Sequence, residues 1–194
     1  MTQLIKDLES IVKERMSVLN GTAHSYEHVN RVVKIATFLA EKEEAGIELV
    51  QVGALLHDVG WAVGKPHNET GAKLASKILK ETNYPREKSE KIVMIILHHP
   101  LAFKDKLETL EEKIVWDADK IDLLGVIGVV RAFHWLGNKP FEAVVKCCFE
   151  ELKPIYNLLN TQTAKKIAKR RHREATAFLS ALEREVAVTD LDLS

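Results

Sequence analysis

This sequence of 194 residues has almost no cysteine, no excess of charge of either sign and no long apolar run. Its two cysteines, Cys147 and Cys148, are neighbours, and neighbouring cysteines rarely reach the geometry of a structural disulfide. No stretch approaches the roughly 18 consecutive apolar residues of a transmembrane helix, and the charged N-terminal segment is unlike a signal peptide. We therefore expect a cytoplasmic protein that has no membrane partner and no disulfides.

The charges balance, because 28 Lys and Arg side chains face 28 Asp and Glu side chains. A protein without net charge has no global field that draws it to a polyanion, so partners must be recognised locally. In the most basic segment, residues 165–173, Ile167 and Ala168 recur at core spacing, and no aromatic residues are interleaved for stacking on bases. We interpret this segment as a solvated helix face, and no nucleic acid is expected as a partner.

Apolar residues recur at three- and four-residue spacing, which is typical of amphipathic helices. The first such series begin at Leu4 and at Val29. Further helices are predicted over residues 47–58, 68–82, 86–99, 107–136, 139–159 and 161–187, separated by glycines and prolines. No alternating strand pattern, internal repeat or low-complexity linker interrupts them. The predicted fold class is all-α, a single-domain helical bundle over residues 1–188 with a frayed tail at 189–194.

The most informative polar residues follow a buried segment, VQVGALLHDVG at residues 50–60. His57 and Asp58 end this apolar helix together. Burying an ionised carboxylate costs several kcal/mol unless it is paired or bound to a cation. Imidazole beside carboxylate is a common ligand set for divalent metals. The alternative is an aspartate that caps the helix end beside a satisfied core histidine.

A second apolar helix, IVWDADKIDLL at residues 114–124, is interrupted by three acids. Asp119 and Asp122 are three residues apart and share a helix face, whereas Asp117 points elsewhere. This spacing permits one metal ligand, Asp119, and one nearby carboxylate that accepts hydrogen bonds. The alternative is an exposed helix face on which Lys120 forms salt bridges.

An early helix carries His28, with His24 one turn before it and Arg31 almost one turn after it. A lone helical histidine is more often a surface or core residue than a ligand. His28 therefore becomes a convincing candidate for a metal ligand only in combination with the two acidic segments.

The ordered series of His28, His57-Asp58 and Asp119 resembles the HD-domain superfamily of metal-dependent phosphohydrolases and phosphodiesterases. The resemblance covers about residues 20–135 through EHVNRVVKIA, ALLHDVGW, HNETGAKLA and EKIVWDADKIDLLG, in the order of the family. It implies an HD-type helical bundle in which His28, His57, Asp58 and Asp119 hold a divalent cation, with Asp58 at the centre.

Three further histidines, His67, His98 and His99, bear on the number of ions. In dinuclear relatives, positions similar to His67 and His98 hold a second metal that is bridged through the Asp58-type carboxylate. In mononuclear relatives these histidines would contact phosphate, and in the simplest alternative they are helix-end residues. The cofactor is expected to be one or two ions of Mn, Fe, Co, Ni, Zn or Mg, because the donor set accepts them all.

A phosphoryl group also needs fixed cationic donors. The candidates for phosphate binding are Arg31, Lys65, Lys120 and Arg131, and the candidate catalytic residues are Asp58, Asp122 and Lys65. Asp122 could instead orient a ligating histidine. Trp61 is expected to be core or wall, and Gly125 and Gly128 are expected to allow close helix packing.

The implied activity is that of a phosphomonoesterase or phosphodiesterase acting on a nucleotide or a related small metabolite by metal-activated water. A di-iron oxygenase of the same fold and a non-catalytic regulatory HD module are the alternatives. A homodimer is left open, because small relatives are often dimers. The substrate itself depends on pocket shape, which no motif here encodes.

Overall fold

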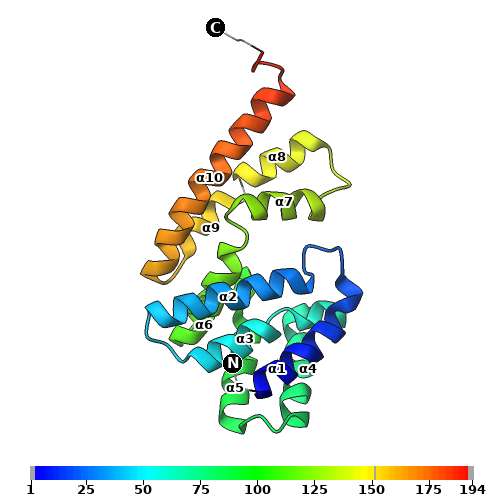
Figure 1. The fold of residues 1–194 in the computed structure, drawn as a ribbon, viewed down its shortest axis with the longest axis vertical. Helices are drawn as coiled ribbons and strands as arrows, with labels where there is room; N and C mark the ends of the chain where they lie inside the picture. Colours follow the sequence, from blue (N-terminus) through cyan, green and yellow to red (C-terminus); the bar gives the residue numbers. More distant parts are fainter. Residues whose placement is uncertain (1–2, 151, 192–194) are drawn as a thin grey trace. The chain divides into compact units, whose positions relative to one another are not determined.

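The computed structural model describes residues 3–150 and 152–191, and the regular elements among these residues are all helices (Figure 1). The α-helices are α1 (Gln3–Arg15), α2 (Tyr26–Lys42), α3 (Ile47–Leu56), α4 (His67–Glu81), α5 (Arg86–His98), α6 (Leu110–Ile121), α7 (Val126–Trp135), α8 (Phe141–Glu150), α9 (Leu152–Leu158) and α10 (Gln162–Val186). Three short 3-10 turns join them, η1 (Met16–Leu19), η2 (Val59–Ala62) and η3 (Leu101–Lys106). The predicted all-α class is confirmed. Within the described ranges, no helix has the length and apolar character needed to span a membrane.

The chain divides into two compact units, Met1–Asp119 and Lys120–Ser194, so that the boundary falls inside α6. Each unit has an apolar cluster of its own. A single domain over residues 1–188 stays a prediction.

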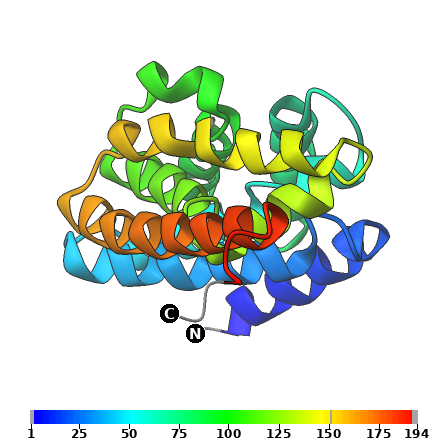
Figure 2. The ribbon, with the colours of Figure 1, turned by 90° about the horizontal axis from the view of Figure 1, so that it is seen from above.

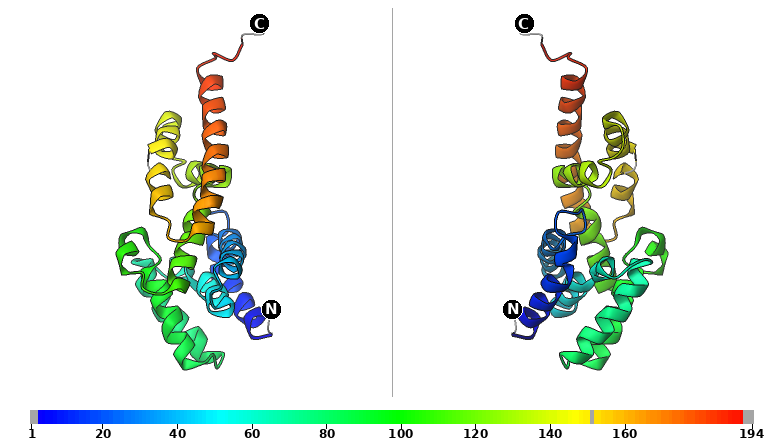
Figure 3. Two further views of the ribbon diagram at one scale, coloured as in Figure 1. Left: turned by 90° about the vertical axis from the view of Figure 1, so that its left-hand side faces the viewer. Right: turned by 90° about the vertical axis from the view of Figure 1, so that its right-hand side faces the viewer.

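The first unit is built on an apolar core to which α1, α3, α4 and α5 all contribute. Leu8, Leu56, Leu79 and Ile96 are almost completely buried in it, one from each of these helices. Helices α4 and α5 run side by side as a pair (Figure 3), and η2 packs on α4. The core therefore holds the C-terminal end of α3, with the turn that follows it, against α4 and α5.

The second unit consists of α7 to α10, in which α8 and α9 run alongside α10 (Figure 2). Val129, Val144, Cys148 and Leu179 are buried in its core. Cys148 is buried, and Cys147 is partly buried.

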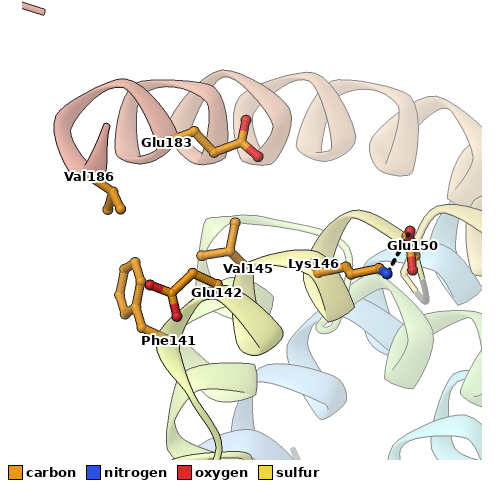
Figure 4. A pocket seen from close by; sticks show the side chains of 7 residues that line it. All are labelled: Phe141, Glu142, Val145, Lys146, Glu150, Glu183 and Val186. Carbon is orange, nitrogen blue, oxygen red and sulfur yellow. Dashed lines mark ion pairs between the residues drawn. The ribbon is translucent and has the colours of Figure 1, made fainter. Parts of the chain in front are cut away.

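A cavity of about 440 Å³ lies between α8 and the C-terminal half of α10. Glu183 and Val186 of α10 face Phe141 and Val145 of α8 across it (Figure 4). None of the site residues predicted from the sequence lines this cavity.

The predicted helix over residues 107–136 is wrong in its continuity, because the structure divides it into α6 and α7. Gly125 is the N-cap of α7, in an extended conformation. A Cβ atom at Gly128 would overlap the backbone carbonyl of Leu123, so the chain turns back on itself closely at this point. These glycines serve a turn between two helices, whereas the sequence suggested packing within one helix.

The predicted helix over residues 139–159 corresponds to α8 and α9, and residue 151 between them lies outside the described residues. In the predicted tail, Thr189, Asp190 and Leu191 are exposed and not helical. Residues 192–194 of that tail lie outside the described part of the chain.

Candidate metal centre

Four predicted ligands lie at or near helix ends of the first unit. His28 is in the first turn of α2, His57 is the C-cap of α3, Asp58 precedes η2, and Asp119 is near the end of α6. All four are buried, with between 0% and 7% of their surface exposed. Buried polar groups at this density need partners, which these four residues provide for one another.

The first group that could hold an ion consists of His28, His57 and Asp119, one donor atom from each lying within 4.8 Å of the others. The Nε2 atoms of the two histidines are 3.3 Å apart, and Nε2 of His28 is 3.4 Å from Oδ1 of Asp119. Two imidazole nitrogens and one carboxylate oxygen thus converge on one small volume. This donor set suits a divalent transition metal.

The tautomer of His57 is set by the backbone. Its Nδ1 donates a hydrogen bond of 2.7 Å to the carbonyl of Ala54. Because a carbonyl only accepts, neutral His57 carries its proton on Nδ1 and turns the lone pair of Nε2 toward the group. Burial lowers the pKa of His57 to about 4, although Asp58 and Asp119 oppose this shift. At neutral pH the ring is therefore ready to act as a ligand.

Asp58 lies between two sets of histidines. Its Oδ2 is 2.8 Å from Nδ1 of His24, 3.5 Å from Nε2 of His28 and 3.6 Å from Nε2 of His57. Its Oδ1 is 3.4 Å from Nε2 of His99. Burial alone would raise the pKa of Asp58, but its histidine neighbours, His57 first and then His24 and His99, outweigh burial and hold this pKa well below its usual value. Asp58 is therefore ionised, with each oxygen directed to a different set.

The second group that could hold an ion consists of Asp58, His67 and His99. His67 is the first residue of α4, and its Nε2 is 3.0 Å from Nε2 of His99. Nδ1 of His99 donates to the carbonyl of Ile96 at 2.7 Å, which directs its Nε2 to the group. Burial, followed by the charge of His99, lowers the pKa of His67 to about 4.

The sequence favoured His98 beside His67, whereas the structure places His99 there. His98 has its Nδ1 3.8 Å from Glu112 Oε2. Consecutive residues on a helix point about 100° apart, so only one of the two neighbours can face the group. The direction in which the chain leaves α5 decides which of the two histidines faces the group. That direction is set by tertiary packing.

His24 was not among the predicted site residues, although its Nδ1 lies 2.8 Å from Oδ2 of Asp58. With His28 and Asp58 it forms a third group that could hold an ion. The spacing of four residues between His24 and His28, one helical turn, was the available signal.

The predicted phosphate-binding residues lie in different surroundings. Lys65 is exposed, with its Nζ 5.4 Å from the centre of the Trp61 ring. Arg31 is half-buried on α2, and Lys120 is buried on α6. In the second unit, Nη1 of Arg131 is 2.9 Å from Oδ2 of Asp122, and both side chains are buried. We interpret this pair as structural, in place of the roles suggested by the sequence.

Acid is expected to destabilise the metal-free protein. Burial lowers the pKa of His57 to about 4 from the ordinary value of 6.5. Between these values the unfolded state binds more protons, so the free energy of unfolding falls as the pH is lowered from about 7.5 to 5.5, by roughly 1 kcal/mol for this residue. Urea unfolding at each pH measures the loss. His57→Gln should reduce this pH dependence, and an unchanged dependence would contradict the assignment.

Known proteins resemble this chain along most of its length. The model of the HD domain family matches residues 25–124. YpgQ of Bacillus subtilis is 27% identical over 205 residues, which cover 98% of each chain. The structure of an HD-superfamily hydrolase from Bacillus thuringiensis is 29% identical, with a TM-score of 0.76 over 94% of this chain and 96% of that chain.

The crystal structure of B. subtilis YpgQ in complex with ADP aligns with a TM-score of 0.78 at 22% identity. It covers 94% of this chain and 97% of that chain. At this level of identity the likeness shows a shared fold.

Proposed function

The chain belongs to the HD-domain family, and from this premise we propose that it is a metal-dependent phosphohydrolase that cleaves a phosphate ester of a nucleotide or a related small metabolite. Its first divalent cation would be held by His28, His57, Asp58 and Asp119. The observation that carries the proposal is the position of Asp58, a buried carboxylate whose two oxygens face different histidine groups.

The donor chemistry supports a second ion on the other side of Asp58. His99 faces Oδ1 and forms a group with His67, as the His28 and His57 pair faces Oδ2. Bridging carboxylates of this kind are a feature of two-metal hydrolytic sites. The set of imidazoles and carboxylates accepts Mn, Fe, Co, Ni, Zn or Mg, and manganese is our first choice for assay.

A bound divalent cation would supply a nucleophile at neutral pH, by lowering the pKa of water, and would polarise a phosphoryl oxygen. The residues of the chain provide the orientation. The carbonyl of Ala54 fixes the His57 ring, and His24 holds the Asp58 carboxylate by a hydrogen bond. The exposed ammonium group of Lys65, next to Trp61, is our candidate for contacting the substrate phosphate, with Arg31 as a second candidate.

The substrate class is proposed from the charge and from one relative. YpgQ of B. subtilis, similar along almost its whole length, has been crystallised with ADP. A nucleoside di- or triphosphate would place its negative charge next to Lys65 and Arg31, the candidate phosphate-binding residues.

Metal removal is the experiment that tests this function. The purified protein is stripped with chelator, its metal content is measured, and release of phosphate or pyrophosphate is assayed with nucleotides and phosphomonoesters. We expect no release without metal and recovery when one of the six cations is added back.

Three outcomes are distinguishable in this assay. Metal-dependent release supports the proposal, and the preferred substrate then defines the activity. Copurification of two iron atoms without cleavage of any phosphate ester would replace it with the di-iron oxygenase. A protein that neither binds metal nor cleaves any ester would be a regulatory HD module.

A further inference from the structure

The indole of Trp61 lies against both groups of candidate ligands. Its ring stacks on His24 with the ring centres 4.4 Å apart and an interplanar angle of 23°. It stacks on His67 at 4.4 Å and 14°. His24 contacts Oδ2 of Asp58, whereas His67 belongs to the group on the Oδ1 side. One side chain therefore touches an imidazole from each of the two groups that contain Asp58.

The backbone holds Trp61 in this place. The preceding residue, Gly60, packs so closely on α4 that a Cβ atom there would overlap the carbonyl of His67 and lie 2.6 Å from the nitrogen of Gly71. The hydroxyl of Thr70 donates to the carbonyl of Gly64 at 2.8 Å, which ties the end of this loop to α4 as well. The indole is thus carried by a segment that is anchored on the same helix as His67.

The other histidines of the centre are oriented differently. His57 and His99 each donate Nδ1 to a backbone carbonyl three residues earlier, and these bonds fix both rings. His24 and His67 share the face of Trp61 instead. Ring orientation matters because a ligand must be held within roughly 10–20° of its productive direction.

We propose that Trp61 is a positioning residue for metal binding, which orients His24 and His67 through stacking and so links the two ligand groups on either side of Asp58. The inference rests on the metal centre of the proposed function, but it does not depend on which reaction that centre performs. The Nζ atom of Lys65 also lies near this ring, 5.4 Å from its centre.

Manganese binding without substrate tests the proposal. Wild type, Trp61→Ala, Trp61→Phe and the control Trp135→Ala are titrated with Mn²⁺ by calorimetry, after circular dichroism has shown that each variant folds. Two aromatic stacks are lost in Trp61→Ala, so Mn²⁺ should bind about tenfold more weakly. Trp61→Phe retains an aromatic face and should recover most of this loss. The control, in the second unit, should bind Mn²⁺ as wild type does.

Fluorescence supplies a second readout. The chain has three tryptophans, and paramagnetic Mn²⁺ quenches an indole only at short range. Quenching should therefore persist in Trp135→Ala and become weaker in Trp61→Phe, in which Trp116, three residues before Asp119, remains. Wild-type affinity in Trp61→Ala, an equal loss in the Phe and Ala variants, or quenching unchanged in Trp61→Phe would each overturn the inference. A wild-type protein that binds Mn²⁺ but cleaves no phosphate ester would refute the proposed function alone. A wild-type protein that binds none of the six divalent cations would overturn both.

Discussion

Asp58→Ala is expected to abolish retention of divalent metal and to lower phosphate release by about three orders of magnitude, because several kcal/mol of transition-state stabilisation are lost with the metal. Asp58 faces both His28 and His99, through different oxygens. Removing it takes the carboxylate away from the histidines on both of its sides at once. Metal content of the purified variant and its rate of phosphate release measure the two effects.

Two matched variants make this result specific. Asp58→Asn keeps the shape of the side chain but not its charge, so it should also lose the metal. Asp105→Ala removes an exposed carboxylate on η3 and should keep wild-type metal content and activity. If Asp58→Ala retained metal and activity, the centre would have to lie elsewhere.

Arg131→Leu is expected to lower the free energy of unfolding by about 3 kcal/mol, because it leaves the carboxylate of Asp122 buried without its cation. The two side chains are joined at 2.9 Å, and Asp122 has no exposed surface. Urea unfolding of wild type and variant measures the difference.

A double variant distinguishes a structural ion pair between Arg131 and Asp122 from a phosphate-binding site. Arg131→Leu with Asp122→Leu removes both charges and should restore much of the lost stability, since burying neither charge avoids the desolvation cost. Replacing Arg86 of the exposed Arg86–Glu90 pair with leucine should cost no more than about 0.5 kcal/mol. Unchanged stability in Arg131→Leu, with weaker nucleotide binding, would return Arg131 to the phosphate-binding role suggested by the sequence.

Local patterns predicted most of the helices correctly, because the spacing of apolar residues is a property of a single helix. They failed where two helices meet in one apolar stretch. At residues 107–136 the periodicity continues through Gly125 and Gly128, and only the close approach of Gly128 to Leu123 shows that the chain turns. A glycine that packs inside a helix and one that permits a turn look alike in a sequence.

The four residues of the HD motif could be predicted because their burial is costly. Histidine and aspartate at the end of an apolar helix require partners wherever the helix packs, and the structure does bring His28, His57, Asp58 and Asp119 together. That these four residues bind a metal ion remains our proposal.

The sequence by itself determined the all-α class, because helical periodicity is a local property, and its motifs, by their resemblance to the HD-domain superfamily, indicated the family and the central residues of the candidate centre. The tertiary structure decided that His99 and not His98 faces His67, that His24 reaches Asp58, and that Trp61 stacks between the two groups. These choices depend on how helix ends are rotated and placed against one another. Long-range packing of α3, α4 and α5 sets that rotation, and no local pattern records it.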